Sequence, residues 1–157
     1  MSDVGCRISD GGLLKVYYLK YESNNVIEFI ILFQKDESMT KDELKRRTKQ
    51  FAINIIRLVE ELPNTKSGNT IGNQIIRSGT SVAANYRSAC RARSNADFIS
   101  KITIVEEECD ETLFWIELII DTGLLKKERL TDIFNEANEL TAIFTATGRT
   151  AKQNNPK

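Results

Sequence analysis

The chain has 157 residues, which is room for one ordinary domain, and 41% of them are hydrophobic, which is enough for a buried core. Lys plus Arg and Asp plus Glu both number 22, so the overall charge indicates neither a nucleic-acid partner nor a membrane partner. Histidine is absent, which excludes Ser-His-Asp catalysis, Cys-His catalysis and histidine-based metal sites. We therefore expect a protein that is not an enzyme.

The first 38 residues differ in character from the rest of the chain. Residues 14–21 and 26–33 are rich in aromatic and β-branched side chains on either side of a polar stretch, which is typical of a β-hairpin. Alternatively, residues 1–38 are an extension translated from an upstream start, with Met39 as the natural start. We favour the extension, because residues 39–42 are themselves a good opening for a helix.

From residue 39 onward the spacing of apolar residues predicts four helices. They are expected at about residues 40–62, 69–92, 95–122 and 127–147, with Ser94 as the N-cap of the third and Gly123 and Gly148 as the residues that end the third and fourth. Residues 64–155 contain no proline to break a long helix. These lengths favour an all-α, up-down-up-down four-helix bundle over residues 39–148, followed by a polar tail without ordered structure at residues 149–157.

Each predicted helix carries an apolar seam that we expect to face the core. The seam residues are Leu44, Phe51, Ile55, Leu58 and Leu62; Ile71, Ile75, Val82 and Ala89; Phe98, Ile102, Val105, Cys109, Thr112, Ile116 and Ile119; and Leu130, Ile133, Ala137, Leu140 and Phe144. Trp115, Phe114 and Tyr86 are expected to anchor the core or a subunit interface.

Small residues dominate the middle of the second helix, from Gly79 to Ala89. Small side chains allow two helix backbones to approach closely, and Gly79 inside a helix costs about 1 kcal/mol against Ala. A catalytic serine is the alternative, but neither Ser78 nor Ser81 has a base available. We favour close packing.

Charge is segregated along the sequence. Residues 66–105 hold six basic residues and one acid, and residues 106–121 hold seven acids and no base. Arg87 and Arg91 share a helix face, and either they pair with the acidic run, within or between subunits, or they bind phosphate. The pairing is the more ordinary outcome of such a charge run.

Metal and redox sites are not expected. The acidic run at residues 106–111 lacks histidine and matching carboxylates on a second helix, so we predict no metal and no cofactor. Cys6, Cys90 and Cys109 are far apart and match neither a disulfide framework nor a zinc site. Their number and spacing are typical of a reduced cytoplasmic protein, and no apolar stretch is long enough to span a bilayer.

Three segments stand in a characteristic order: IGNQIIRSGTSVAANY at residues 71–86, a Ser94-x-x-Asp-Phe98 motif, and EEECDETLFW at residues 106–115. Through them, residues 41–148 resemble the bacterial four-helix-bundle family of the 23S rRNA intervening sequence protein. The family tends to begin close to Met39. Its relatives include the accessory protein of diversity-generating retroelements, which binds a reverse transcriptase and nucleic acid.

The resemblance implies a ring-like homopentamer with no catalytic residues to carry over. It assigns Gln74, Arg77, Ser78, Ser81 and Asn85 to the family's signature helix, and Trp115 lies in the third match. Our first hypothesis is a non-enzymatic oligomeric scaffold that binds RNA, DNA or a nucleic-acid-handling protein such as a reverse transcriptase through Arg77, Arg87, Arg91, Arg93 and Lys101. The alternative is a pure protein-interaction module in which the arginines bridge subunits to the acidic run.

Overall fold

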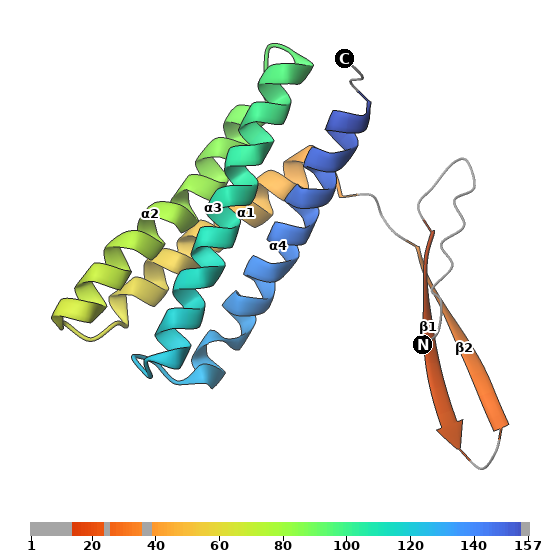
Figure 1. The fold of residues 1–157 in the computed structure, drawn as a ribbon, viewed down its shortest axis with the longest axis horizontal. Coiled ribbons are helices and arrows are strands. Elements are labelled where there is room, and N and C mark those ends of the chain that lie inside the picture. The colour runs from red at the N-terminus through yellow and green to blue at the C-terminus, as the bar shows by residue number, and fades with distance from the viewer. Residues whose placement is uncertain (1–13, 24–25, 36–38, 155–157) are drawn as a thin grey trace. The chain divides into compact units, whose positions relative to one another are not determined.

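The computed structural model describes residues 14–23, 26–35 and 39–154, and the chain divides into two compact units, residues 1–40 and 41–157. The first unit contains strands β1 (Leu14–Ser23) and β2 (Val26–Lys35). They form a two-stranded antiparallel sheet, in which the end residues Leu14 and Lys35 are partners (Figure 1). The segment therefore forms the β-hairpin that its composition allowed, and a natural start at Met39 stays a prediction.

The second unit consists of four helices: α1 (Lys41–Glu60), α2 (Lys66–Ala89), α3 (Asn95–Asp121) and α4 (Lys127–Gln153). Short loops connect them, and successive helices run in opposite directions (Figure 1). Neighbours in sequence pack side by side, and α1 also packs against α4. The predicted all-α, up-down four-helix bundle is confirmed for this unit, and the ring-like assembly stays a prediction.

The core of the bundle is built from the predicted apolar seams. All four seam residues of α2 and all five of α4 are buried, and so are six of the seven in α3. Leu62 and Phe98 are only partly covered, because each lies at an end of the bundle where fewer helices surround it. The heptad-like spacing therefore identified the inward face of every helix.

The predicted start of α3 is confirmed, and the predicted bounds of α2 shift by three residues at each end. Ser94 is the N-cap of α3, and its hydroxyl accepts a hydrogen bond of 3.1 Å from the backbone N–H of Asp97. In α2 the N-cap is Thr65, whose hydroxyl accepts a hydrogen bond of 3.1 Å from the backbone N–H of Gly68. The helix therefore begins at Lys66 rather than residue 69 and ends at Ala89 rather than residue 92.

Gly123 ends α3 as predicted. Its φ of 65° lies in the left-handed region, where a residue without a Cβ atom avoids a steric penalty. The backbone N–H of Gly123 donates a hydrogen bond of 3.1 Å to the carbonyl of Ile120. This hydrogen bond caps the last turn of the helix.

The predicted end of α4 at Gly148 is wrong. The helix continues to Gln153, and Gly148 is buried inside it. A Cβ atom at this position would lie 3.5 Å from Ile102 of α3, so the glycine marks a place where two helices approach each other. Residues 149–153, predicted as part of a polar tail, are helical.

Gly79 confirms the packing interpretation of the small residues in α2. A Cβ atom at this position would lie 2.7 Å from Cγ1 and 2.9 Å from Cγ2 of Ile55 in α1. Real Cβ atoms almost never approach other heavy atoms so closely. The absence of a side chain at Gly79 is therefore what lets α2 lie against α1 at this distance.

Candidate nucleic-acid interface

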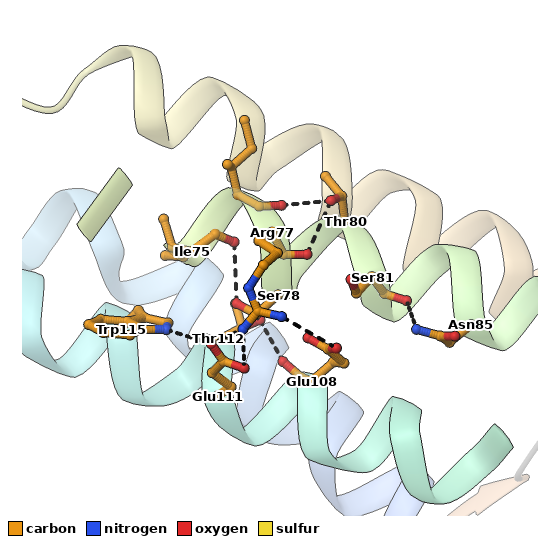
Figure 2. Close-up of polar contacts among 11 residues, drawn as sticks. Ile75, Arg77, Ser78, Thr80, Ser81, Asn85, Glu108, Glu111, Thr112 and Trp115 are labelled. Carbon is orange, nitrogen blue, oxygen red and sulfur yellow. Dashed lines mark hydrogen bonds and ion pairs between the residues drawn. The ribbon is translucent and has the colours of Figure 1, made fainter. Parts of the chain in front are cut away.

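The polar residues singled out in α2 face α3 and the solvent beside it (Figure 2). Ser78 is fully buried, and its hydroxyl forms a hydrogen bond of 2.9 Å with the hydroxyl of Thr112 in α3. Ser78 also lies 3.4 Å from the carbonyl of Ile75, and no base among the described residues contacts it. The hydrogen bond to Thr112 joins α2 to α3 inside the bundle.

The other signature residues of α2 are less buried. The side-chain amide of Asn85 donates a hydrogen bond of 3.0 Å to the backbone carbonyl of Ser81, one turn earlier (Figure 2). Both side chains are half-buried. Gln74 is half-buried as well. These residues form a shallow polar surface along α2.

Arg77 forms an ion pair across the α2–α3 seam (Figure 2). One guanidinium nitrogen donates hydrogen bonds of 2.5 Å and 2.8 Å to the two carboxylate oxygens of Glu111. The indole N–H of Trp115 donates a hydrogen bond of 3.1 Å to the same carboxylate. Trp115 also packs against the core, as predicted for an anchoring aromatic residue. For Arg77 the structure therefore shows pairing with the acidic run within one chain.

Glu108 lies beside this ion pair but is poorly satisfied. Its Oε1 is 3.9 Å from the nearest guanidinium nitrogen of Arg77, and its Oε2 is buried without a hydrogen-bond partner among the described residues. Burial raises the pKa of the Glu108 carboxyl above its usual value, and the nearby Arg77 only partly opposes this. The ionised form of Glu108 therefore weakens the folded state.

We expect Glu108→Gln to raise the free energy of unfolding at pH 7, because it removes a partly buried charge that lacks a full partner. The folded pKa lies above the unfolded value of 4.5, so the folded state binds the proton first as the pH falls. The stability of the unmodified protein should therefore rise towards that of the variant as the pH falls through the folded pKa. Urea unfolding at several pH values measures this.

The same substitution at the exposed neighbour Glu107 serves as the control and should change stability little at any of these pH values. A Glu108→Gln variant that is less stable at pH 7 would show that attraction to Arg77 outweighs the cost of burial.

The remaining basic residues of the predicted site gather where α2 ends and α3 begins. Arg87, Arg91 and Arg93 are exposed, and within the described residues no hydrogen bond or ion pair holds their side chains. Lys101 forms an ion pair with Asp97 one turn away in α3. Arg77 lies ten residues before Arg87, about 15 Å along the helix at 1.5 Å per residue, so the structure does not bring it into this group.

The loop that carries two of these arginines is well fixed. The backbone N–H of Arg91 donates a hydrogen bond of 3.0 Å to the carbonyl of Ser88. The backbone N–H of Arg93 donates a hydrogen bond of 2.9 Å to the carboxylate of Asp97. These two hydrogen bonds, together with the cap at Ser94, hold the short connection between α2 and α3 in one conformation. The arginine side chains therefore project from an ordered backbone.

The cysteine thiols and the acidic run are the described groups to compare with redox and metal sites. Cys90 and Cys109 are free thiols, and Cys6 lies outside the described residues. Cys109 is buried in the core, and burial raises the pKa of its thiol to about 12. Among the described residues, no three cysteine or carboxylate side chains are grouped so that they could hold a metal ion.

None of the four helices in the described range is both long and apolar enough to cross a membrane.

The arrangement defines the class of protein: a four-helix bundle with a polar α2–α3 seam and an arginine-rich connection between those two helices. The chain belongs to the family of the 23S rRNA-intervening sequence protein, whose family model matches residues 40–146. The match covers the four-helix unit and confirms the family resemblance of the sequence.

A solved structure supports the same assignment. The chain is similar to a protein of unknown function from the S23 ribosomal protein family of Bacteroides thetaiotaomicron VPI-5482, with 36% sequence identity and a TM-score of 0.62. The similarity covers 66% of this chain and 96% of that protein. No curated protein matches the chain.

Proposed function

We propose that this protein is a non-enzymatic scaffold that assembles with itself and binds the phosphate backbone of nucleic acid at the end of α2. The observation that carries the proposal is the state of Arg87, Arg91 and Arg93. All three are exposed, and within the described residues no acidic side chain pairs with them. One acid of the run in α3, Glu111, pairs with Arg77 instead.

Arginine suits this role chemically. Its planar guanidinium presents a fork of N–H donors that matches two phosphate oxygens, and it stays charged at every physiological pH. Phosphate contacts give affinity without sequence preference and are weakened by salt. An arginine cluster on an ordered loop therefore supports backbone binding rather than base recognition.

The non-enzymatic part of the proposal rests on the sequence, which lacks histidine, and on Ser78, whose hydroxyl contacts Thr112 rather than a base. The self-assembly rests on the family resemblance. Exposed apolar side chains on the bundle, among them Ile104 and Phe114, offer surface for subunit contacts.

The test compares binding of a short fluorescently labelled single-stranded RNA to the wild-type chain and to the Arg87→Ala plus Arg91→Ala variant. Loss of two phosphate contacts should weaken binding roughly ten-fold at moderate salt. The control replaces Arg57 and Lys66, two exposed basic residues at the other end of the bundle, with Ala and should bind as the wild type does. Equal binding by both variants and the wild type would contradict the proposal.

A pure protein-interaction module is the second candidate, and the Arg77–Glu111 pair favours it because it shows that an arginine of α2 can bind the acidic run. In such a module Arg87 and Arg91 would pair with the acids of a neighbouring subunit. The same double variant would then lose mass in light scattering. Under the scaffold proposal its mass stays that of the wild type.

A further inference from the structure

The topology of the bundle brings four segments that are far apart in sequence to one end. In an up-down arrangement, the start of α1, the end of α2, the start of α3 and the end of α4 lie together (Figure 1). Contacts confirm this for three of the helices. The ring of Tyr86 near the end of α2 lies 5.2 Å from that of Phe144 in α4, and Gly148 lies against Ile102 of α3.

This end of the bundle is strongly basic. Residues 41–49, 87–101 and 149–153 hold eleven basic residues and three acids, and one of the basic residues, Arg47, is paired with Glu136 and Glu139 of α4. At the opposite end, residues 53–68 and 116–132 hold five basic residues and six acids. A chain with no net charge therefore folds into a bundle with one basic end.

Eight of the basic side chains are exposed, and within the described residues no hydrogen bond or ion pair holds them. They are Lys41, Arg46 and Lys49 of α1; Arg87, Arg91 and Arg93 at the end of α2; and Arg149 and Lys152 of α4. We call these eight residues the basic end.

Two of the three acids in these ranges, Asp42 and Asp97, are held by other partners. Asp42 accepts a hydrogen bond of 2.9 Å from the ammonium of Lys45, and this contact lowers the pKa of Asp42. Asp97 pairs with Lys101 and accepts the backbone N–H of Arg93, and these contacts lower the pKa of Asp97. Each carboxylate also attracts one residue of the basic end, Arg46 for Asp42 and Arg93 for Asp97. Two such acids offset only part of the charge of eight exposed basic side chains.

We infer that the whole basic end, and not the end of α2 alone, is the surface that binds the nucleic-acid backbone. The inference rests on the proposed function and extends its site to Lys41, Arg46 and Lys49 of α1 and to Arg149 and Lys152 of α4. Two helices side by side are about 20 Å wide, so one strand crossing this end passes several phosphates. Several charges can therefore act at once.

The chemistry favours a nucleic acid over an anionic membrane. Five of the eight residues are arginine, whose guanidinium pairs with phosphate in two-point geometry. Surface helices that bind membranes bury an apolar face in the lipid. Within residues 41–49, 87–101 and 149–153, no large hydrophobic side chain is exposed. This end therefore offers little apolar side-chain surface to insert into a bilayer.

The test neutralises the two newly assigned parts of the site separately. We expect Arg149→Gln plus Lys152→Gln, and likewise Lys41→Gln plus Lys49→Gln, to weaken binding of the labelled RNA by roughly ten-fold each. Each pair should also make the plot of log affinity against log salt shallower by about 1.4, since each phosphate contact contributes about 0.7 on a single strand. The matched control is Lys126→Gln plus Lys127→Gln, an exposed pair at the opposite end, which should leave both values unchanged.

The outcomes separate this inference from the function on which it rests. RNA binding that Arg87→Ala plus Arg91→Ala weakens, but that neither new pair affects, would overturn the inference and leave the proposed function standing. No RNA binding by the wild type would overturn both. Tighter binding to phosphatidylserine vesicles than to RNA would also overturn the inference, and the helical circular dichroism of each variant checks that it is folded.

Discussion

Phe144→Ala should lower the free energy of unfolding by about 3–5 kcal/mol, the usual cost of removing a fully buried phenylalanine. Phe144 has no exposed surface and packs against the ring of Tyr86 with an interplanar angle of 54°. The truncation would remove this aromatic contact between α4 and α2 and leave a cavity in the core. Since small domains have about 5–15 kcal/mol in total, the loss would be a large part of the stability.

The matched control is Phe114→Ala. Phe114 is 49% exposed, although its ring lies 5.0 Å from that of Trp115, so its truncation should cost less than about 1 kcal/mol. Both variants are compared by urea unfolding of the helical signal at one protein concentration, because self-association adds to apparent stability. Equal losses for the two phenylalanines would contradict the core described for this bundle.

Gly79→Ala should destabilise the bundle by about 1–2 kcal/mol, even though alanine is the better helix former. The new Cβ atom would stand 2.7–2.9 Å from the side chain of Ile55 and 3.1 Å from its Cβ atom. Ile55 is fully buried and its Cβ cannot swing aside, so α1 and α2 would have to move apart. The strain of that movement outweighs the gain of up to about 1 kcal/mol in helix propensity.

Gly148→Ala is the matched control, because Gly148 is also a buried glycine inside a helix. Its new Cβ atom would meet Ile102 at 3.5 Å, which is ordinary van der Waals contact. We therefore expect this variant to be more stable than the wild type by up to about 1 kcal/mol, in the same unfolding assay. A stabilising Gly79→Ala change would mean that the close approach of α1 and α2 is not required.

The four helices could be predicted because periodicity and caps are local properties of the sequence. The spacing of Ile71, Ile75 and Val82, for example, determines which face of α2 is buried wherever its neighbours lie. Ser94 and Gly123 similarly act through backbone geometry within a few residues.

The end of α4 was mispredicted because glycine has two roles that look alike in a sequence. Gly123 ends a helix with a positive φ, whereas Gly148 lies buried inside a helix and faces α3. Only the neighbouring helix distinguishes the two. The error mattered, because it left Arg149 and Lys152 in a supposed tail rather than at the end of an ordered helix.

The candidate site could be predicted only in part for a related reason. The cluster of bases near Arg87 and Arg91 is visible in the sequence, because both lie in one short stretch. The partner of Arg77 depends on how α2 and α3 are rotated against each other, which places Glu111 within 2.5 Å. The contribution of α1 and α4 to the basic end requires the assembled bundle, since residues 41–49 and 149–153 are a hundred positions apart.

The central claim is that an uncompensated basic surface of this bundle binds a nucleic-acid backbone. Its most direct test is the affinity of the wild-type chain for a short single-stranded RNA across a series of salt concentrations. We expect log affinity to fall linearly with log salt, with a slope of about −2 to −4, as for three to six phosphate contacts. Binding that does not change with salt, or no binding at low salt, would contradict the claim.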